Sequence, residues 1–314
     1  MALWTPAEIA TALWLDASDS STITIATGIS NWADKSGNLN DAQQGTGSAQ
    51  PTVNSGGLNS LDTISFNGTS QFLALPTGFL YNAIAFSLFI VLKCGVQSNA
   101  GHFGPNTSNN AGIELLDNTI VSKPTLVRIN GSEKYSTGAW RTDSSFSISS
   151  IVANSSAVSG FLDGTALTPA SGISALNYNG YYAIGKYSTT YFSSLEVAEF
   201  IIITSDLSSE NRQLIEGYLA WKWGLQDNLP ANHLYKAYAP TIYTSTGGII
   251  LSGTSLYNII RDITLNSYGG IILSGNSILE ADWIRFVLDN VKITQQDSIY
   301  SVTQKASKFI ATLL

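Results

Sequence analysis

A strand that is apolar on both faces, followed at once by a helix, constrains the fold of this 314-residue chain more than any other feature. Residues 195–204 (LEVAEFIIIT) carry apolar and β-branched residues on both sides, which predicts a strand that is covered on both faces. The period then becomes helical, with Ser208 or Ser209 suited to begin the helix and Gly224 suited to end it. The helical stripe consists of Leu214, Tyr218, Trp221 and Leu225, widened by Ile215 and Leu219. A central strand and an amphipathic helix beside it predict a layered fold.

The other apolar segments before residue 240 are short and separated by turn residues. Residues 86–93, 147–153 and 158–162 read as strands, with Asn, Ser and Gly between them. Many short strands with turns at such intervals indicate an all-β sandwich. We therefore expect the single clear helix to close a fold that otherwise consists of strands.

Four segments also occur in the order known from one family. They are LWLDASD at 13–19, SNWADKSGN at 30–38, ISFNG at 64–68 and LSSENRQLIEGYLAWKWGL at 207–225. In these segments the chain resembles the laminin-G-like (concanavalin A-like) domains of bacteriophage structural proteins. The resemblance implies a concanavalin A-like jelly-roll sandwich with one C-terminal helix. It does not select a function, because this sandwich hosts lectins, glycosidases and structural modules alike.

The pattern changes after Pro240. The motif GGIILSG at 247–253 recurs at 269–275, which is 22 positions later (269 minus 247). Two copies bury too little surface for a free-standing solenoid, which needs about three. We therefore predict a sandwich domain at 1–240 and a β-rich attachment or oligomerisation region at 241–314 that binds a sister subunit or a capsid. The residues expected to make that contact are Ile249, Ile250, Leu251, Ile271, Ile272, Leu273, Trp283 and Phe286.

Charge and hydropathy argue against several partners. The formal net charge is −7 and no cluster of Lys and Arg is present, which disfavours nucleic acid as a partner. No apolar stretch is long enough to span a bilayer, so we expect no membrane insertion. The first residues lack the basic and apolar regions of a secretory signal. Cys94 is the only cysteine, and its place at the end of an apolar strand predicts a buried thiol without chemistry.

An enzymatic function finds little support in the sequence. The nearest approach to the carboxylate pair of a concanavalin A-like glucanase is Glu196 and Glu199. Because side chains alternate along a strand, this odd spacing predicts that the two carboxylates lie on opposite faces. They would then be unable to flank one glycosidic bond at the ~5 Å that a retaining glycosidase needs. We expect no enzymatic activity, and a glycan hydrolase is the least favoured alternative.

Calcium is the one cofactor that the sequence suggests. In the segment DKSGNLND at 34–41, Asp34, Asn38 and Asp41 offer side-chain oxygens, and the segment resembles a loop near a bound calcium in some relatives. These oxygens could supply part of the six to eight ligands that calcium takes. The alternative is a turn rich in Asp and Asn that caps its own backbone and holds no ion.

A group of tyrosines beside Asn and Gly is the candidate glycan site. Sugar sites combine aromatic faces with amide hydrogen bonds, whereas tyrosines at strand ends also serve as half-buried packing. The candidate residues are Tyr178, Tyr181, Tyr182, Tyr187 and Tyr191.

The function favoured by these observations is that of a non-enzymatic bacteriophage virion protein. It would be a head decoration or accessory surface protein, assembled in the host cytoplasm, that contacts other virion proteins and further copies of itself through residues 241–314. The alternative is a receptor-binding adhesin or tail fibre tip that binds host surface glycans.

Overall fold

The computed structural model describes residues 2–94, 100–107, 111–118, 123–135, 144–245, 249–252, 264–267, 271–274, 288–295 and 303–309. The chain forms two compact units, one of residues 5–237 and one of residues 1–4 with 238–314. Within the described ranges, no helix combines the length and the hydropathy that a membrane crossing requires.

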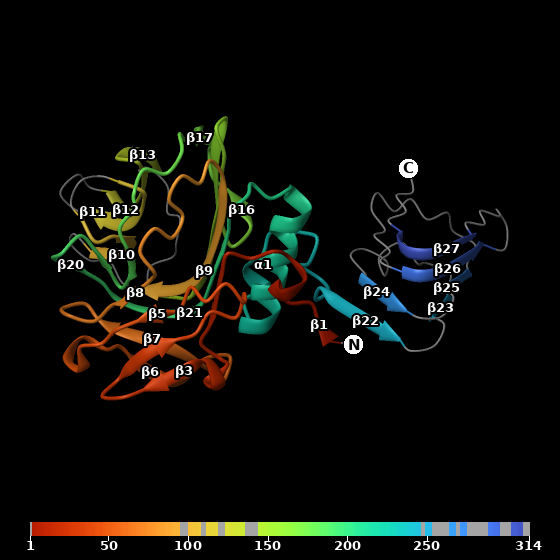
Figure 1. Ribbon diagram of the computed structural model, residues 1–314, viewed down its shortest axis with the longest axis horizontal. Helices are drawn as coiled ribbons and strands as arrows, with labels where there is room; N and C mark the ends of the chain where they lie inside the picture. Colours follow the sequence, from red (N-terminus) through yellow and green to blue (C-terminus); the bar gives the residue numbers. More distant parts are fainter. Residues whose placement is uncertain are drawn as a thin grey trace. The chain divides into compact units, whose positions relative to one another are not determined.

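The first unit is a sandwich of two antiparallel sheets, which confirms the all-β prediction (Figure 1). The β9 sheet has the strand order β16 (Thr165–Ala166), β15 (Ala157–Leu162), β14 (Ser147–Ala153), β9 (Phe86–Cys94), β21 (Ser194–Ile203), β7 (Leu61–Asn67) and β6 (Thr52–Leu58), with β17 (Ala170–Ser171) on β15 and β2 (Leu13–Asp16) on β21. The β18 sheet has the order β13 (Ser132–Tyr135), β12 (Lys123–Ile129), β11 (Ile113–Asn118), β10 (Ala100–Pro105), β18 (Tyr182–Ile184), β8 (Leu73–Ala74), β5 (Ala42–Gln43), β4 (Ile29–Trp32) and β3 (Ile23–Ile25). A hairpin of β19 (Lys186–Tyr187) and β20 (Tyr191–Phe192) stands apart from both.

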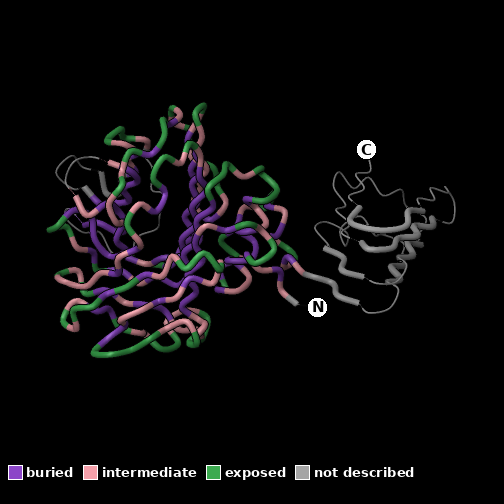
Figure 2. Tube along the Cα trace, viewed as in Figure 1, coloured by how far each residue is buried: buried purple, intermediate pink, exposed green. Residues whose placement is uncertain are grey.

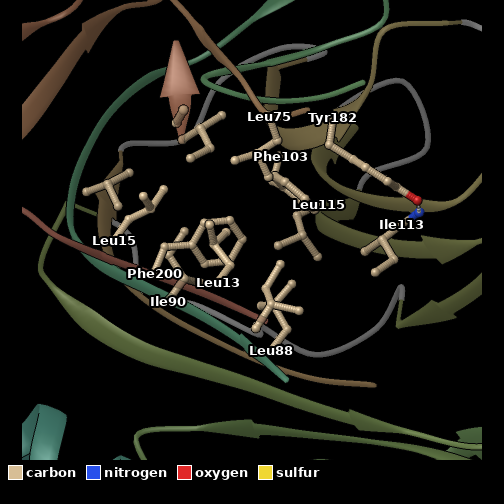
Figure 3. Packing of buried hydrophobic residues seen from close by; sticks show 14 of the residues in the cluster. Leu13, Leu15, Leu75, Leu88, Ile90, Phe103, Ile113, Leu115, Tyr182 and Phe200 are labelled. Carbon is tan, nitrogen blue, oxygen red and sulfur yellow. Dashed lines mark hydrogen bonds between the residues drawn. The ribbon is translucent and has the colours of Figure 1, made fainter. Parts of the chain in front are cut away.

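One continuous apolar core fills the space between the two sheets. Leu88, Ile90 and Phe200 point into it from the β9 sheet, and Phe103 and Tyr182 point into it from the β18 sheet (Figure 3). The inner strands are buried along their length, whereas the connecting loops are exposed (Figure 2). The strand predicted at 195–204 is β21, and it lies inside its sheet, between β9 and β7.

Helix α1 (Ser209–Trp223) lies on the outer face of the β9 sheet, against β9 and β14. Its ends match the prediction, because Ser208 accepts a hydrogen bond from the Asn211 amide and Gly224 has a left-handed φ of 71°. The buried face is rotated from the predicted stripe: Ile215 and Trp223 are buried, whereas the predicted Leu214 and Trp221 are half-buried. Polar residues explain the error, since Arg212 and Glu216 are also buried. Short 3-10 turns occur at Pro6–Glu8, Ser20–Thr22, Gly47–Ala49 and Gln226–Asn228.

The second unit contains a coil of parallel strands with a constant offset. β22 (Thr241–Ser245) pairs with β24 (Thr264–Ser267), β23 (Ile249–Ser252) pairs with β25 (Ile271–Ser274), and β25 pairs with β26 (Leu288–Gln295). Ile249, Ile271 and Ile293 are in register, 22 residues apart each time (271 minus 249, 293 minus 271). β1 (Ala2–Leu3) pairs antiparallel with β22, and β27 (Thr303–Phe309) pairs antiparallel with β26.

This register changes how the repeat is understood. The sequence showed two copies of GGIILSG, but the backbone stacks a third turn whose sequence lacks the motif. Of the residues predicted to make contacts, Ile249, Ile250 and Leu251 lie on β23, and Ile271, Ile272 and Leu273 lie on β25. Trp283 and Phe286 lie outside the described residues.

Candidate functional site

Glu196 and Glu199 lie on the same face of the β9 sheet, which corrects the prediction of opposite faces. A β-bulge shifts the register of β21 between Val197 and Glu199. Glu196 therefore lies opposite Lys93 and Glu199 opposite Val91, two residues apart on β9. An inserted residue reverses the alternation beyond it, so the odd spacing no longer separates the two side chains.

Neither glutamate is available for acid–base chemistry. Glu199 is fully buried and accepts hydrogen bonds from Trp14 Nε1 (2.6 Å), Tyr218 Oη (2.8 Å), Trp223 Nε1 (2.7 Å) and Lys222 Nζ (2.8 Å). Burial raises the pKa of Glu199, and Lys222 opposes that rise. With both oxygens fully bonded, this carboxylate joins α1 and β2 to the sheet. Glu196 is held by an ion pair with Lys93 at 2.5 Å and accepts from Asn54 and Thr63.

A second buried carboxylate fixes the other end of α1. Glu216 is fully buried and accepts from Ser150 Oγ at 2.7 Å, and it is paired with Arg212 and with His233 Nε2 at 3.2 Å. Asp163 lies close by and accepts from the Ile148 amide at 2.8 Å. Burial, opposed by that hydrogen bond and reinforced by Glu216, raises the pKa of Asp163 to about 6.

His102 stands in a buried polar cluster with the composition of a hydrolase triad. Its Nε2 lies 3.2 Å from Asp117 Oδ1 and 4.0 Å from Cys94 Sγ, and its Nδ1 lies 2.7 Å from Ser193 Oγ. Burial lowers the pKa of His102, but Cys94 and Asp117 outweigh it and raise that pKa to about 9. His102, Asp117 and Ser193 are all fully buried. A nucleophile must reach its substrate, so this cluster is part of the core, and the prediction of a buried Cys94 thiol is confirmed.

The loop predicted to hold calcium does not fit that ion. Asp34 accepts hydrogen bonds from the Trp14 and Ser36 amides on one oxygen, and from Ser36 Oγ and the Asn40 amide on the other. Two bonds on each oxygen fill the acceptor capacity of a carboxylate. Asn38 donates its side-chain amide to the Thr11 carbonyl. The oxygens of Asp34 therefore hold the turn together, as the alternative reading of the sequence anticipated.

Asp41 differs from Asp34 in having acceptor capacity to spare. Its Oδ1 accepts from the Asp34 amide at 2.9 Å, while its Oδ2 has one long contact of 3.4 Å, with Asn31 Nδ2. Asp41 is half-buried and faces a surface groove.

The five candidate tyrosines do not form one site. Tyr182 is fully buried and stacks on Phe103 with a centroid distance of 5.2 Å, and Tyr187 is also buried. These two positions correct the prediction, because a buried ring cannot contact a glycan. Tyr178 is half-buried and donates its hydroxyl to the Tyr181 carbonyl. Tyr191 is exposed on the hairpin and stacks on Tyr187. Tyr181 alone faces the groove that also contains Asp41.

We call this groove the Tyr181 groove. Its volume is about 390 Å³, and its lining combines apolar and polar residues from β5, β8 and the segments beside them: Leu39, Asp41, Gln43, Ala74, Leu75, Pro76, Thr77 and Tyr181. The pairing Ala42–Gln43 explains its position, since Ala42 is buried in the core and Gln43 points away from it. Within the described ranges, no hydrogen bond engages the side chains of Gln43, Thr77 or Tyr181. These groups are available to a ligand.

No protein-family model and no curated protein sequence matches this chain. Solved structures resemble its fold. The Trypanosoma rangeli sialidase in complex with sialic acid matches 71% of this chain and 34% of its own, with a TM-score of 0.50 and 14% identity. The chain has a lectin-like β-sandwich fold. At this identity, the likeness establishes the fold and nothing further.

Two further structures of this kind have TM-scores just below 0.5. The binding domain of Paraclostridial Mosquitocidal Protein 1 has a TM-score of 0.48 and 12% identity, over 67% of this chain and 52% of that one. Domain 4 of AbnA, a GH43 extracellular arabinanase from Geobacillus stearothermophilus solved with arabinotriose, has a TM-score of 0.47 and 13% identity, over 63% and 94%. This lectin-like sandwich thus spans about half of the mosquitocidal chain and a third of the sialidase chain.

The sequence did not reveal the groove residues Gln43 and Thr77. Each is an isolated polar residue at the end of a short strand, with no motif around it. Only the pairing of β5 with β8 brings Gln43 opposite Ala74, and hence near Tyr181.

Proposed function

We propose that this protein is a glycan-binding module and that the Tyr181 groove is its binding site. The carrying observation is that an aromatic ring lies in an open groove beside a carboxylate, an amide and two hydroxyls that have bonding capacity left. Sugars present apolar ring faces and a dense set of hydroxyl groups. Aromatic rings pack against the former, while carboxylate and amide groups bond the latter.

The groove favours binding over hydrolysis. Glycoside hydrolysis normally uses two carboxylates on either side of the bond that is cleaved. Asp41 is the only carboxylate among the residues that line the groove. Glu196 and Glu199 share a face of the other sheet, but Glu199 is enclosed beneath α1 and Glu196 is neutralised by Lys93. We therefore propose a role without catalysis.

The test is a glycan array probed with the full chain, followed by titration of the strongest binder. Tyr181→Ala is expected to lower the affinity about 10-fold, because one aromatic ring contributes on the order of 1 kcal/mol beyond its buried area. Tyr191→Ala is the matched control, since Tyr191 is an exposed tyrosine outside the groove. An array without binding, or an equal loss in both variants, would contradict the proposal.

We propose as a second candidate that residues 241–314 attach the sandwich to a bacteriophage particle, on which the glycan site is displayed. Two observations favour it: the resemblance of residues 1–240 to domains of bacteriophage structural proteins, and a parallel coil with a 22-residue period in residues 241–314. Such coils stack units along one axis. Cosedimentation with particles is expected for the full chain and not for a chain that ends at Pro240. Equal cosedimentation of both would contradict it.

A further inference from the structure

Lys186 is a buried lysine without an anionic partner. Its exposed fraction is 5%. Its ammonium nitrogen lies 3.6 Å from the ring centroid of Phe72, 5.7 Å from that of Tyr181 and 6.0 Å from that of Phe192. Within the part of the chain that the structure describes, no carboxylate and no hydrogen-bond acceptor contacts this ammonium. The ring faces stabilise the cation, but they replace only part of its lost hydration.

The backbone explains how Lys186 comes to lie beside Tyr181. β18 pairs with β8 so that Ala183 lies opposite Ala74, which lines the groove. The strand then turns at Gly185, whose φ of 90° suits glycine alone. A Cβ atom there would come within 2.5 Å of the Phe66 ring. This turn starts the β19–β20 hairpin, from which the Lys186 ammonium reaches the rings of Phe72 and Tyr181.

We propose that the Tyr181 groove selects glycans that carry an anionic group, a carboxylate or a sulfate, and that Lys186 pairs with this group. The inference rests on the proposed glycan binding and adds the class of glycan. A partly desolvated cation with no counter-ion gains a charge-assisted hydrogen bond when an anion arrives. The desolvation that follows from burial lowers the pKa of Lys186 to about 8, so the amine is still mostly cationic at neutral pH.

The charges elsewhere do not prevent this pairing. The formal net charge of −7 repels anions at long range, but screening limits that repulsion to about 8 Å at physiological salt. Asp41 lines the same groove and would repel a ligand anion at close range. The two charges together fix an orientation in which the anionic group of the ligand lies at Lys186 and its neutral hydroxyls face Asp41.

The experiment compares neutral and anionic forms of the same sugars against the full chain by calorimetric titration. The probes are lactose, sialyllactose and sulfated lactose, with cellobiose and its glucuronate-containing analogue as a second series. Wild type is expected to bind the anionic members about 10-fold more tightly than the neutral ones. Lys186→Met, which keeps the length and apolar stem without the charge, is expected to abolish this preference and leave the affinity for the neutral sugars unchanged.

Lys93→Met is the matched control, because Lys93 is a strand lysine that already has a partner in Glu196. It should keep the full preference, and thermal melts of both variants verify that they fold. Equal binding of neutral and anionic sugars by wild type, or a preference that survives Lys186→Met, would overturn the inference while leaving glycan binding intact. Binding of neither form would instead contradict the proposed function. A preference for only the carboxylated or only the sulfated probes would identify the anion.

Discussion

The two outer faces of the sandwich use polar side chains in opposite ways. Beneath α1, the carboxylates of Glu199 and Glu216 are fully buried and accept hydrogen bonds from several neighbouring side chains. In the Tyr181 groove, Gln43 and Thr77 have no hydrogen bond among the described residues, and Asp41 has one oxygen nearly free. Polar groups with full bonding hold the fold together, whereas those with open capacity at a surface are the ones that a ligand can use.

The largest expected effect is on the closed face. Glu199→Leu would leave the indoles of Trp14 and Trp223 without their acceptor and the Lys222 ammonium without one of its two carboxylates. Removing one partner of a buried charge network costs about 3–5 kcal/mol. Urea unfolding should therefore show a large loss of stability.

The comparison variant for Glu199→Leu is Glu196→Leu. The Lys93–Glu196 pair is partly exposed, and such pairs contribute only about 0–1 kcal/mol. Equal losses in the two variants would show that Glu199 does not hold the helix to the sheet.

A smaller loss of stability is expected at the turn that positions Lys186. Gly185→Ala combines a positive φ with a clash against Phe66, which together should cost about 2–4 kcal/mol. Gly37→Ala shares the positive φ but has open space around its Cβ, so it should cost about 1 kcal/mol. Chemical unfolding of both measures the difference. A loss at Gly185 no greater than that at Gly37 would remove the steric part of the argument.

The pH dependence of stability tests the closed face more gently. The pKa of Asp163 is raised to about 6 in the folded state, above the value of about 4 for an unfolded chain. The folded state then binds more protons between these values, so this residue stabilises the fold below pH 4 and loses that contribution as the pH rises to 6. Asp163→Asn should flatten the stability profile over this window by about 1–2 kcal/mol. An unchanged profile would contradict the shift.

The smallest effect on stability, and a clear one on binding, is expected in the groove. Gln43→Ala should leave the free energy of unfolding within about 0.5 kcal/mol of wild type, because its amide has no partner to lose. The same change should weaken glycan binding about 5-fold, since one hydrogen bond is removed. Titration and unfolding of this variant together separate a binding residue from a structural one. A destabilised protein with unchanged affinity would reverse the assignment.

Local patterns predicted the parts of the fold that local interactions decide. β21 follows from its run of apolar residues, and α1 follows from Ser208 and Gly224 at its two ends. The bulge beside Glu199 was not predictable, because it depends on how β21 pairs with β9 and no residue within the strand signals it. The error about the two glutamates came from that single inserted residue.

The groove shows the same limit more strongly. Of five tyrosines with similar neighbours in the sequence, one lines the groove and two are buried, and the difference lies in which side of β18 each residue occupies. In the second unit, the third turn of the coil has the register of the first two but not their motif, so a search for repeats could not find it. Contacts between strands that are distant in sequence decided each of these cases.

A crystal structure of the full chain with the strongest binder from the glycan array tests the central claim most directly. The account predicts a sugar ring packed against Tyr181, with its hydroxyls bonded to Asp41 and Gln43. A glycan bound anywhere else on the sandwich, with the Tyr181 groove free of sugar, would contradict it.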